Sequence, residues 1–394
     1  MVVSKELEVD RISALSNELV ALILSFLQMK DVMKTCILCS RWKYIWTKVP
    51  ILDFSGFHVS HSLLPSFKSF VYKALLLNDA LLLRRFSMDH LDEFEDFHVN
   101  SWVWSVMSRN VVEISLSTSV FKQKRLVEAV FSSETLQVLK LNGRFVLPSV
   151  IPSVQNLPNL ELLHLIDVAF EQNDSLPALL SVCPRLKQVL LRRCLGPNEV
   201  HIQSSSLRKL EIISRADDKK VVLNLPKLEY ISFTQARSCC EIKAVEPLSC
   251  LVDAVLNGPW NGHGRGIIDL LHQSSKLKTL TLAQLMVNHS LEHGGAKLPV
   301  FINLSLLECT DDSWEPVVYF LTLPENTPKC LAHSLRFVEI NDFCGYGSHL
   351  KLAEYILTYA EVLKVMKIYT AREDWHKEMD GLMKLFSVDR ASTH

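Results

Sequence analysis

One short apolar pattern recurs through most of this 394-residue chain. Each copy begins with an apolar residue and has apolar residues again three and five positions later, with polar residues between them. That alternation is typical of a strand buried on one side. Clear copies begin at Leu136, Leu160, Leu186, Leu207, Leu228, Leu277, Leu335 and Leu363, and weaker ones at Val49, Leu83, Val111, Leu251 and Phe301.

The spacing of these copies indicates how they assemble. From Leu136 onward, successive starts are roughly 21 to 34 residues apart, mostly within or near the range of leucine-rich repeats. A single strand with its return segment cannot bury its apolar side, so such units stack into a parallel sheet with a shared core. We therefore predict an α/β fold, an irregular leucine-rich-repeat solenoid whose variable connections include short helices and loops.

The strand alternation also predicts which side chains face outward, namely those two, four and six positions after each start. Phosphate ligands or nucleic acid would require clustered basic residues, and these rows are instead mixed in sign and partly apolar. A protein partner suits them better, although any one of these side chains can equally be a solvated residue without a contact. The candidate substrate-binding residues are Lys140, His164, Arg192, Lys209, Glu211 and Tyr230, and the middle row continues through Ser305, Glu339 and Lys367.

Charge and cysteine usage limit the class of partner. The formal net charge is -1 and the pI is about 6.9, so no global field attracts the chain to nucleic acid or to an anionic membrane. The longest mostly apolar run, Leu19 to Leu27, is too short to span a bilayer. Ten scattered cysteines without a secretion signal indicate reduced thiols. We expect a cytoplasmic or nuclear protein, or one found in both compartments.

The segment from Asp10 to Phe54 reads as three short helices. Ser16 or Asn17 is expected to cap the first helix and Asp31 the second, and the third is expected from Arg41 onward, with Trp42 and Trp46 one turn apart. A unit of this size buries little surface by itself. Because its leucines exceed one helical stripe, the segment predicts a partner surface.

This segment, from DRISALSNELVALILSFLQMKD to SRWKYIWTKVPILDF, resembles the F-box. The resemblance implies that it binds a Skp-type adaptor and, through it, a cullin. Ser16 departs from the family, which usually has proline there, and this change is expected to loosen entry into the first helix. The alternative is an ordinary helical domain with core leucines. The adaptor-binding residues implied by the resemblance are Leu15, Leu19, Ile23, Leu24, Leu27 and Trp42.

The segment from Leu323 to Ile368 reads as a strand, a glycine-containing turn, a helix and a second strand. It resembles the FBD region that follows the repeats in many plant F-box proteins. A last amphipathic helix with Trp375, Met379, Leu382 and Phe386 is expected to cap the open end of the repeats. The predicted organisation is a tail (1–9), an F-box (10–54), repeats (55–322), an FBD region (323–370) and a capping helix with tail (371–394).

Three cysteine, histidine and glycine patterns resemble metal or phosphate sites, but none is expected to be one. Cys36 and Cys39 lack a second ligand pair at zinc spacing, and His289 and His293 lie in an expected loop. The glycines of NGPWNGHGRG lack the lysine and hydroxyl of a phosphate-binding loop. We therefore expect no catalytic residue, no metal and no cofactor.

Together, the resemblances imply a non-catalytic substrate-recognition subunit of an SCF-type ubiquitin ligase, holding an unknown target protein on its repeats. Two alternatives remain at this point. One is a co-receptor of the same architecture that needs a small molecule in a pocket on the repeat face. The other is an F-box scaffold that binds the adaptor without serving a ligase.

Overall fold

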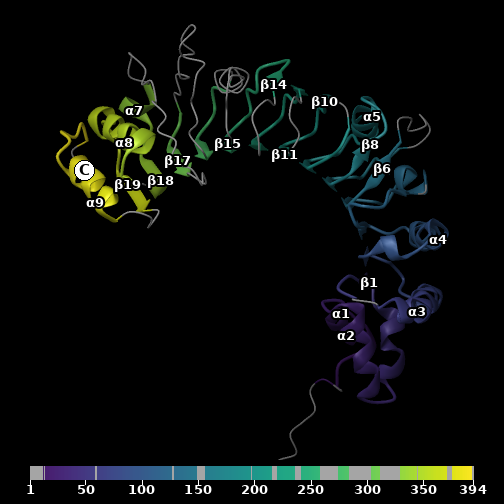
Figure 1. The fold of residues 1–394 in the computed structure, drawn as a ribbon. Helices are drawn as coiled ribbons and strands as arrows, with labels where there is room; N and C mark the ends of the chain where they lie inside the picture. The colour runs from purple at the N-terminus through teal and green to yellow at the C-terminus, as the bar shows by residue number, and fades with distance from the viewer. Residues whose placement is uncertain are drawn as a thin grey trace, which may run out of the picture. The chain divides into compact units, whose positions relative to one another are not determined.

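The computed structural model describes residues 12, 14–57, 60–126, 128–148, 156–196, 198–214, 220–235, 241–257, 274–283, 303–310, 329–343, 345–370 and 375–392. The chain forms two compact units (Figure 1). Unit 1 comprises residues 1–146 and 152–160, and unit 2 comprises residues 147–151 and 161–394. No helix within the described ranges is both long and apolar enough to cross a membrane.

The repeat pattern builds one parallel sheet layer in each unit, with strands in sequence order. In unit 1 the strands are β1 (Ile51–Phe54), β2 (Arg85–Met88), β3 (Glu113–Ser117) and β5 (Val138–Asn142). In unit 2 they are β7 (Leu162–Ile166), β9 (Gln188–Arg192), β11 (Lys209–Ser214), β13 (Tyr230–Gln235), β15 (Asp253–Asn257), β16 (Thr279–Ala283), β17 (Leu306–Thr310), β18 (Phe337–Phe343) and β19 (Val365–Thr370).

The core follows the three apolar positions of each repeat. In the repeat that starts at Leu160, the start itself, Leu163 and Leu165 are each 0% exposed. The weaker copies behave in the same way, because Leu83, Phe86 and Met88 are also buried. The predicted α/β repeat architecture is therefore confirmed, and its alternation places the intervening residues on the opposite face.

A left-handed residue ends many of the strands. Seven positions after the repeat start, the backbone has a positive φ in the copies that begin at Val49, Leu83, Leu136, Leu160 and Leu186. At Gly143 a side chain is impossible, since a Cβ would lie 2.0 Å from the carbonyl oxygen of Thr118. These turns occur at Gly56, His90, Gly143, Asp167 and Arg193.

One repeat start was predicted wrongly. The copy assigned to Phe301 begins three residues later, because Leu304 and Leu307 are buried and Leu307 pairs with Leu280 and Val338. The register therefore places Glu308 opposite Thr281 and Glu339, and Ser305 precedes the strand. Both Phe301 and Leu304 are apolar, so the pattern alone could not select between them.

The return segments of unit 1 are helical, with short strands between. They are η3 (His61–Leu63), α3 (Leu64–Leu77), η4 (Leu91–Glu93), α4 (Asp96–Met107), β4 (Lys124–Arg125), η5 (Glu128–Ser132) and β6 (Phe145–Leu147). Aromatic rings join α3 to the sheet and, through Phe94, to α4: ring centroids are 6.3 Å apart for Phe54 of β1 and Phe67 of α3, 5.7 Å for Phe67 and Phe94, and 5.2 Å for Phe94 and Trp102 of α4.

The return segments of unit 2 include a second parallel sheet, which the sequence pattern did not predict. Its strands are β10 (Glu199–Gln203), β12 (Lys220–Asn224) and β14 (Glu241–Ala244), and β8 (Ala169–Phe170) and α5 (Ser175–Ser181) precede them. Val200, Ile202, Val221 and Leu223 of this sheet are buried. The runs of β10 and β12 alternate as the main strands do but do not carry the recurring pattern that begins with an apolar residue and has apolar residues three and five positions later, so that pattern did not single them out.

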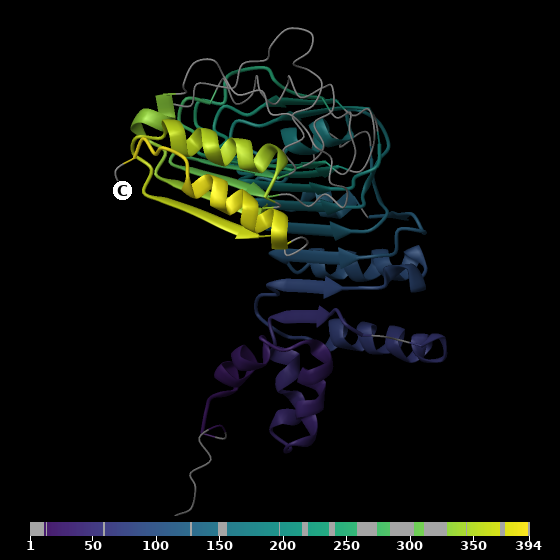
Figure 2. The same ribbon diagram turned by 60° about the vertical axis from the view of Figure 1, so that its left-hand side comes forward.

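The C-terminal part of unit 2 is a strand, helix and strand, as predicted (Figure 2). Parallel strands β18 and β19 are joined by α8 (Gly347–Tyr359), and α7 (Lys329–His333) precedes them. The buried face of α8 carries Ala353, Ile356 and Leu357, whereas Tyr359 is exposed. Helix α8 therefore packs through Ala353, Ile356 and Leu357.

The last helix, α9 (Trp375–Phe386), has a different buried face from the expected one. Glu378, Gly381 and Leu385 are buried, while Trp375 and Phe386 are 67% and 73% exposed. The reason is a close backbone approach, since a Cβ on Gly381 would lie 2.4 Å from the Cα of Gly345. This contact turns the two aromatic side chains outward.

Candidate protein-binding surfaces

The first helix of unit 1, α1 (Asn17–Leu24), begins at Ser16. The backbone N–H of Leu19 donates a hydrogen bond to Ser16 Oγ over 3.3 Å, which satisfies one free donor of the first turn. Hydrogen bonds from its own backbone N–H and from the Ser16 hydroxyl lower the pKa of Glu18. Ser16 thus gives the helix a defined start, and the expected loosening by the missing proline stays a prediction.

The second helical segment begins before the residue predicted to cap it. Helix α2 spans Met29–Lys34 with Gln28 at its N-cap, so Asp31 lies inside the first turn and the predicted cap was wrong. Asp31 instead pairs with Lys34, with 2.7 Å between Oδ1 and Nζ. The segments η1 (Thr35–Ile37) and η2 (Trp42–Lys48) complete the helical part.

These helices enclose a small core of their own. Arg41, just before η2, donates from Nε to Asn17 Oδ1 over 2.8 Å and from its guanidinium to the Leu15 carbonyl, which ties η2 to α1. Leu24 belongs to the core, because only 2% of it is exposed, and we correct its assignment from docking residue to core residue. The core residues are Val20, Ala21, Leu24, Met29, Val32, Ile45 and Trp46.

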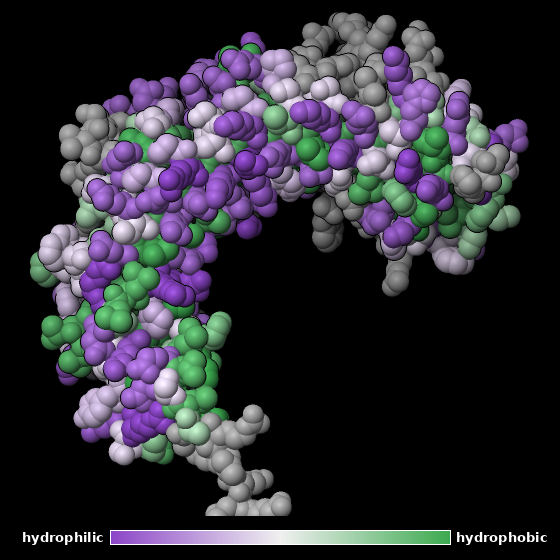
Figure 3. Space-filling model, turned by 180° about the vertical axis from the view of Figure 1, so that it is seen from behind, coloured by the Kyte–Doolittle hydropathy of each residue, from purple (hydrophilic) through white to green (hydrophobic). Residues whose placement is uncertain are grey.

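The opposite side of α1 leaves large apolar side chains in solvent. Leu19, Ile23 and Leu27 are 49%, 50% and 41% exposed; Leu19 and Ile23 are one helical turn apart on α1 and Leu27 follows its end, and Leu15 and Trp42 are half-buried. Figure 3 shows apolar side chains gathered at this end of the chain. An exposed patch of this kind marks an interaction site. Five further apolar residues that the sequence reading did not assign are exposed here: Leu22, Phe26, Ile37, Leu38 and Tyr44.

We call these exposed side chains the α1 surface, consisting of Leu19, Leu22, Ile23, Phe26 and Leu27. A helical wheel read from the sequence could have included Phe26 and Leu22, since both have the spacing of the stripe. It could not show which of the two apolar sides of α1 is buried. That choice depends on packing against η2, which carries the buried Ile45 and Trp46.

The outward face of unit 2 brings together three of the predicted substrate-binding residues. Lys209 Nζ lies 2.7 Å from Glu211 Oε1 and 4.8 Å from the ring centroid of Tyr230. The hydrogen bond and charge of Glu211 raise the pKa of Lys209. Register places Tyr230 beside Lys209 on the adjacent strand. The three side chains therefore form one cluster whose charges already compensate each other.

His164 and Arg192 lie on the same face but outside that cluster. His164 is half-buried and pairs in register with Leu190, which in turn pairs with Glu211. Arg192 is exposed in the neighbouring row. The rows are thus mixed in character, as the sequence predicted.

Lys140 belongs to unit 1 and makes a separate network there. Its Nζ lies 2.9 Å from Glu113 Oε1, and Arg85 Nε lies 2.8 Å from Glu113 Oε2. Burial alone would raise the pKa of Glu113, but hydrogen bonds from Lys140 and Arg85 outweigh it and lower that pKa. Lys140 is therefore committed to an internal ion pair.

The metal and phosphate patterns find no support in the part of the chain that the structure describes. No group of three or more histidine, cysteine or acidic side chains able to hold a metal occurs among the described residues. Burial raises the pKa of the Cys36 thiol, which disfavours the thiolate that zinc requires. His289, His293 and the glycines of residues 258–266 lie outside the described residues.

Comparison with known proteins agrees with this arrangement. Residues 12–54 match the F-box domain, residues 99–251 match the LRR repeats of FBD-associated F-box protein At5g56370, and residues 323–368 match FBD. The F-box match extends through β1, so it overlaps the first repeat strand. Fold and surfaces thus define a class, an F-box protein with leucine-rich repeats.

Relatives that span nearly the whole chain place it more closely. F-box/FBD/LRR-repeat protein At4g26340 of Arabidopsis thaliana is 26% identical, with 98% of each chain covered. F-box/LRR-repeat protein 13 of the same plant is 27% identical, covering 98% of this chain and 95% of the relative. The chain is thus similar over nearly its whole length to plant F-box/FBD/LRR-repeat proteins, and its three matched segments are an F-box, LRR repeats and FBD.

Proposed function

We propose that this chain is the substrate-recognition subunit of an SCF-type ubiquitin ligase. Its α1 surface binds a Skp-type adaptor, which connects it to a cullin, and its repeats hold a target protein. The observation that carries the proposal is the exposure of Leu19, Ile23 and Leu27 on an otherwise well-packed helical unit. Fully burying an aliphatic side chain of this size contributes about 1.5–3 kcal/mol relative to leaving it in water.

In this role the chain contributes proximity rather than chemistry. Holding a target beside the ubiquitin-charged enzyme converts an encounter between separate molecules into a step within one complex. The three matching family models describe an F-box, repeats and FBD. A non-catalytic subunit acting in the cytoplasm, the nucleus or both follows from this proposal.

Co-purification with the adaptor and the cullin tests the proposal. The variant Leu19→Ala/Ile23→Ala/Phe26→Ala should lose both partners, because all three side chains are exposed and truncation leaves the core intact. The matched control is Leu76→Ala/Leu81→Ala, since these leucines are 83% and 108% exposed in the same unit but outside the α1 surface. The control should retain both partners.

Three outcomes would distinguish the alternatives. Unchanged capture by the triple variant would contradict the assignment of the α1 surface. Capture of the adaptor without the cullin would favour the scaffold role. Capture of a target only after addition of a small molecule would favour the co-receptor role.

A further inference from the structure

The last strand of unit 2 is less covered than the strands before it. In β18 the inward-facing Val338 and Ile340 are 1% and 0% exposed. Their register partners in β19, Met366 and Ile368, remain half-exposed, and no residue of β19 is buried. Helix α9 therefore does not seal the core at this end.

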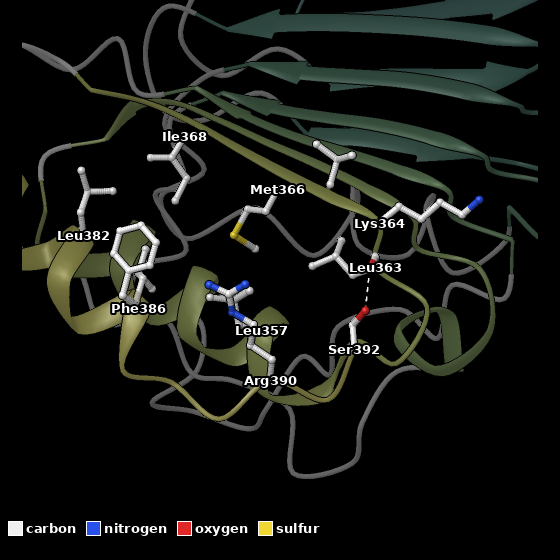
Figure 4. Close-up of a pocket in the computed structure, with 11 residues that line it drawn as sticks. Leu357, Leu363, Lys364, Met366, Ile368, Leu382, Phe386, Arg390 and Ser392 are labelled. Carbon is white, nitrogen blue, oxygen red and sulfur yellow. Dashed lines mark hydrogen bonds between the residues drawn. The ribbon is translucent and has the colours of Figure 1, made fainter. Parts of the chain in front are cut away.

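A cavity of about 280 Å³ lies where that seal is incomplete. Figure 4 shows Met366 and Ile368 pointing toward Leu382 and Phe386 of α9, with the guanidinium of Arg390 between them. Pockets that hold drug-sized ligands measure roughly 300–1,000 Å³. This cavity is smaller, and it suits one or two side chains of another polypeptide.

Arg390 gives the cavity a charge preference. Its side chain makes no hydrogen bond or ion pair with the rest of the chain as far as the described residues go. A guanidinium in a partly apolar site favours a carboxylate, which it can bind through two hydrogen bonds. An occupant with one acidic and one apolar side chain on the same face would satisfy both features of the cavity.

The backbone of β19 offers a matching row of hydrogen-bonding groups. Among the described strands β18 is its single neighbour in the sheet, and the N–H of Val365 donates to the carbonyl of Arg336 over 3.1 Å. Because successive residues of a parallel strand bond to opposite sides, the N–H and C=O groups of Met366 and Ile368 face the unpaired edge. An open strand edge is a template for another strand.

We propose that the edge of β19 and the cavity beneath it bind an extended peptide of a partner protein, which adds a strand to the sheet. Its inward side chains are one apolar residue, which enters the cavity, and one acidic residue, which pairs with Arg390. A second copy of β19 fits poorly, because its sequence VMKIYT contains no acidic residue. The inference does not depend on adaptor binding by the α1 surface.

Binding of designed peptides to the full chain, measured by fluorescence polarisation, tests this proposal. The probe is labelled Thr-Val-Thr-Glu-Thr-Val-Thr, which presents valine and glutamate on one face when extended. Two matched probes replace glutamate by lysine or methylate every amide nitrogen, so that no N–H of the peptide can pair with β19 in either strand direction. The glutamate peptide should bind at least about tenfold more tightly than either matched probe.

Two variants locate the binding. Ile368→Pro removes an N–H that faces the open edge while sparing the bonds to β18, and it should weaken binding at least about tenfold, whereas Ile368→Val should stay within about twofold. Arg390→Gln should abolish the preference for glutamate over lysine. This exposed substitution is expected to leave thermal unfolding unchanged, so it remains informative if the proline variant unfolds.

Several results would overturn the proposal. They are no binding of the glutamate peptide at millimolar concentration, equal binding of the glutamate and lysine peptides, or binding that is insensitive to Arg390→Gln. Concentration-dependent dimerisation that Ile368→Pro removes would also overturn it, since a second copy would then occupy the edge.

Discussion

The α1 surface and the Lys209 cluster differ in how their side chains are satisfied within the chain. On α1, Leu19 and Ile23 are about half-exposed and contact little of their own unit. On the repeats, Lys209 is bound to Glu211 and lies over Tyr230. Apolar groups left in water gain free energy when a partner covers them, whereas paired charges must first lose their partners or their water.

This difference suggests a division of roles between the two surfaces. Affinity for a constant partner suits the α1 surface, where burial is non-directional and each anchor adds to binding. Selection among targets suits the repeat face, where mixed charges favour one complementary surface and penalise others. The predictions below test this division, beginning with the largest effect.

The sharpest test of the α1 surface uses two adjacent residues. Leu24→Ala should lower the free energy of unfolding of unit 1 by about 2–5 kcal/mol, because it removes a buried side chain and leaves a cavity. Ile23→Ala should change it by less than about 0.5 kcal/mol, because Ile23 is half-exposed. Denaturant unfolding of both variants makes the measurement. Equal losses would mean that Ile23 belongs to the core and would remove the basis of the α1 surface.

A smaller effect is expected on the repeat face. Lys209→Met removes the ion pair with Glu211 and the contact with Tyr230, and it should cost about 0.2–1 kcal/mol because both charged groups are partly in water. Adaptor capture should stay unchanged. A double-mutant cycle with Glu211→Gln measures the coupling. A coupling of several kcal/mol would show that the Lys209–Glu211 pair mainly stabilises the fold and is not readily replaced by contacts with a target.

The smallest predicted effect is a pH dependence that involves Glu113. Its folded-state pKa is lowered below the ordinary 4.5, so its contribution to stability is fully present above about pH 4.5 and is lost as pH falls through the folded value. Lys140→Met removes one of the two cations beside Glu113. It should bring the folded-state pKa of Glu113 closer to 4.5 and so narrow the pH range over which this stabilisation is lost. Acid unfolding followed by circular dichroism compares the two proteins. Identical acid transitions for the two proteins would contradict a role of the Lys140, Glu113 and Arg85 network in stability. The control is Lys187→Met, which removes the exposed ion pair with Glu161.

The repeat architecture could be predicted because the apolar period is strict. Leu139 and Leu141, like their counterparts in most other repeats, are buried where the pattern places them, whereas Met366 and Ile368 of the last strand are not fully buried. The prediction failed where two choices satisfied the same pattern, as with Phe301 and Leu304. It also failed where backbone contacts decide the geometry, since the Gly345 and Gly381 approach turns Trp375 outward.

The binding residues were only partly predictable for a related reason. Helix α1 is apolar on more than one side, so its sequence supports either orientation, and Leu24 was placed on the wrong side. The outward residues of the repeat face were easier to predict, because side chains alternate between the two sides of a strand and one side is buried in the core. The half-open cavity beside Arg390 has no sequence signal, since it arises from incomplete packing of α9 on β19.

Site-specific labelling tests the α1 surface most directly. Phe26→Cys should react rapidly with a maleimide in the free protein, because this position is 84% exposed, and binding of the adaptor should slow that reaction at least about tenfold. Leu81→Cys should react at the same rate with and without the adaptor, when each site is read by mass spectrometry. Equal reaction of Phe26→Cys in both states, with the adaptor bound, would contradict the claim that α1 is the docking surface.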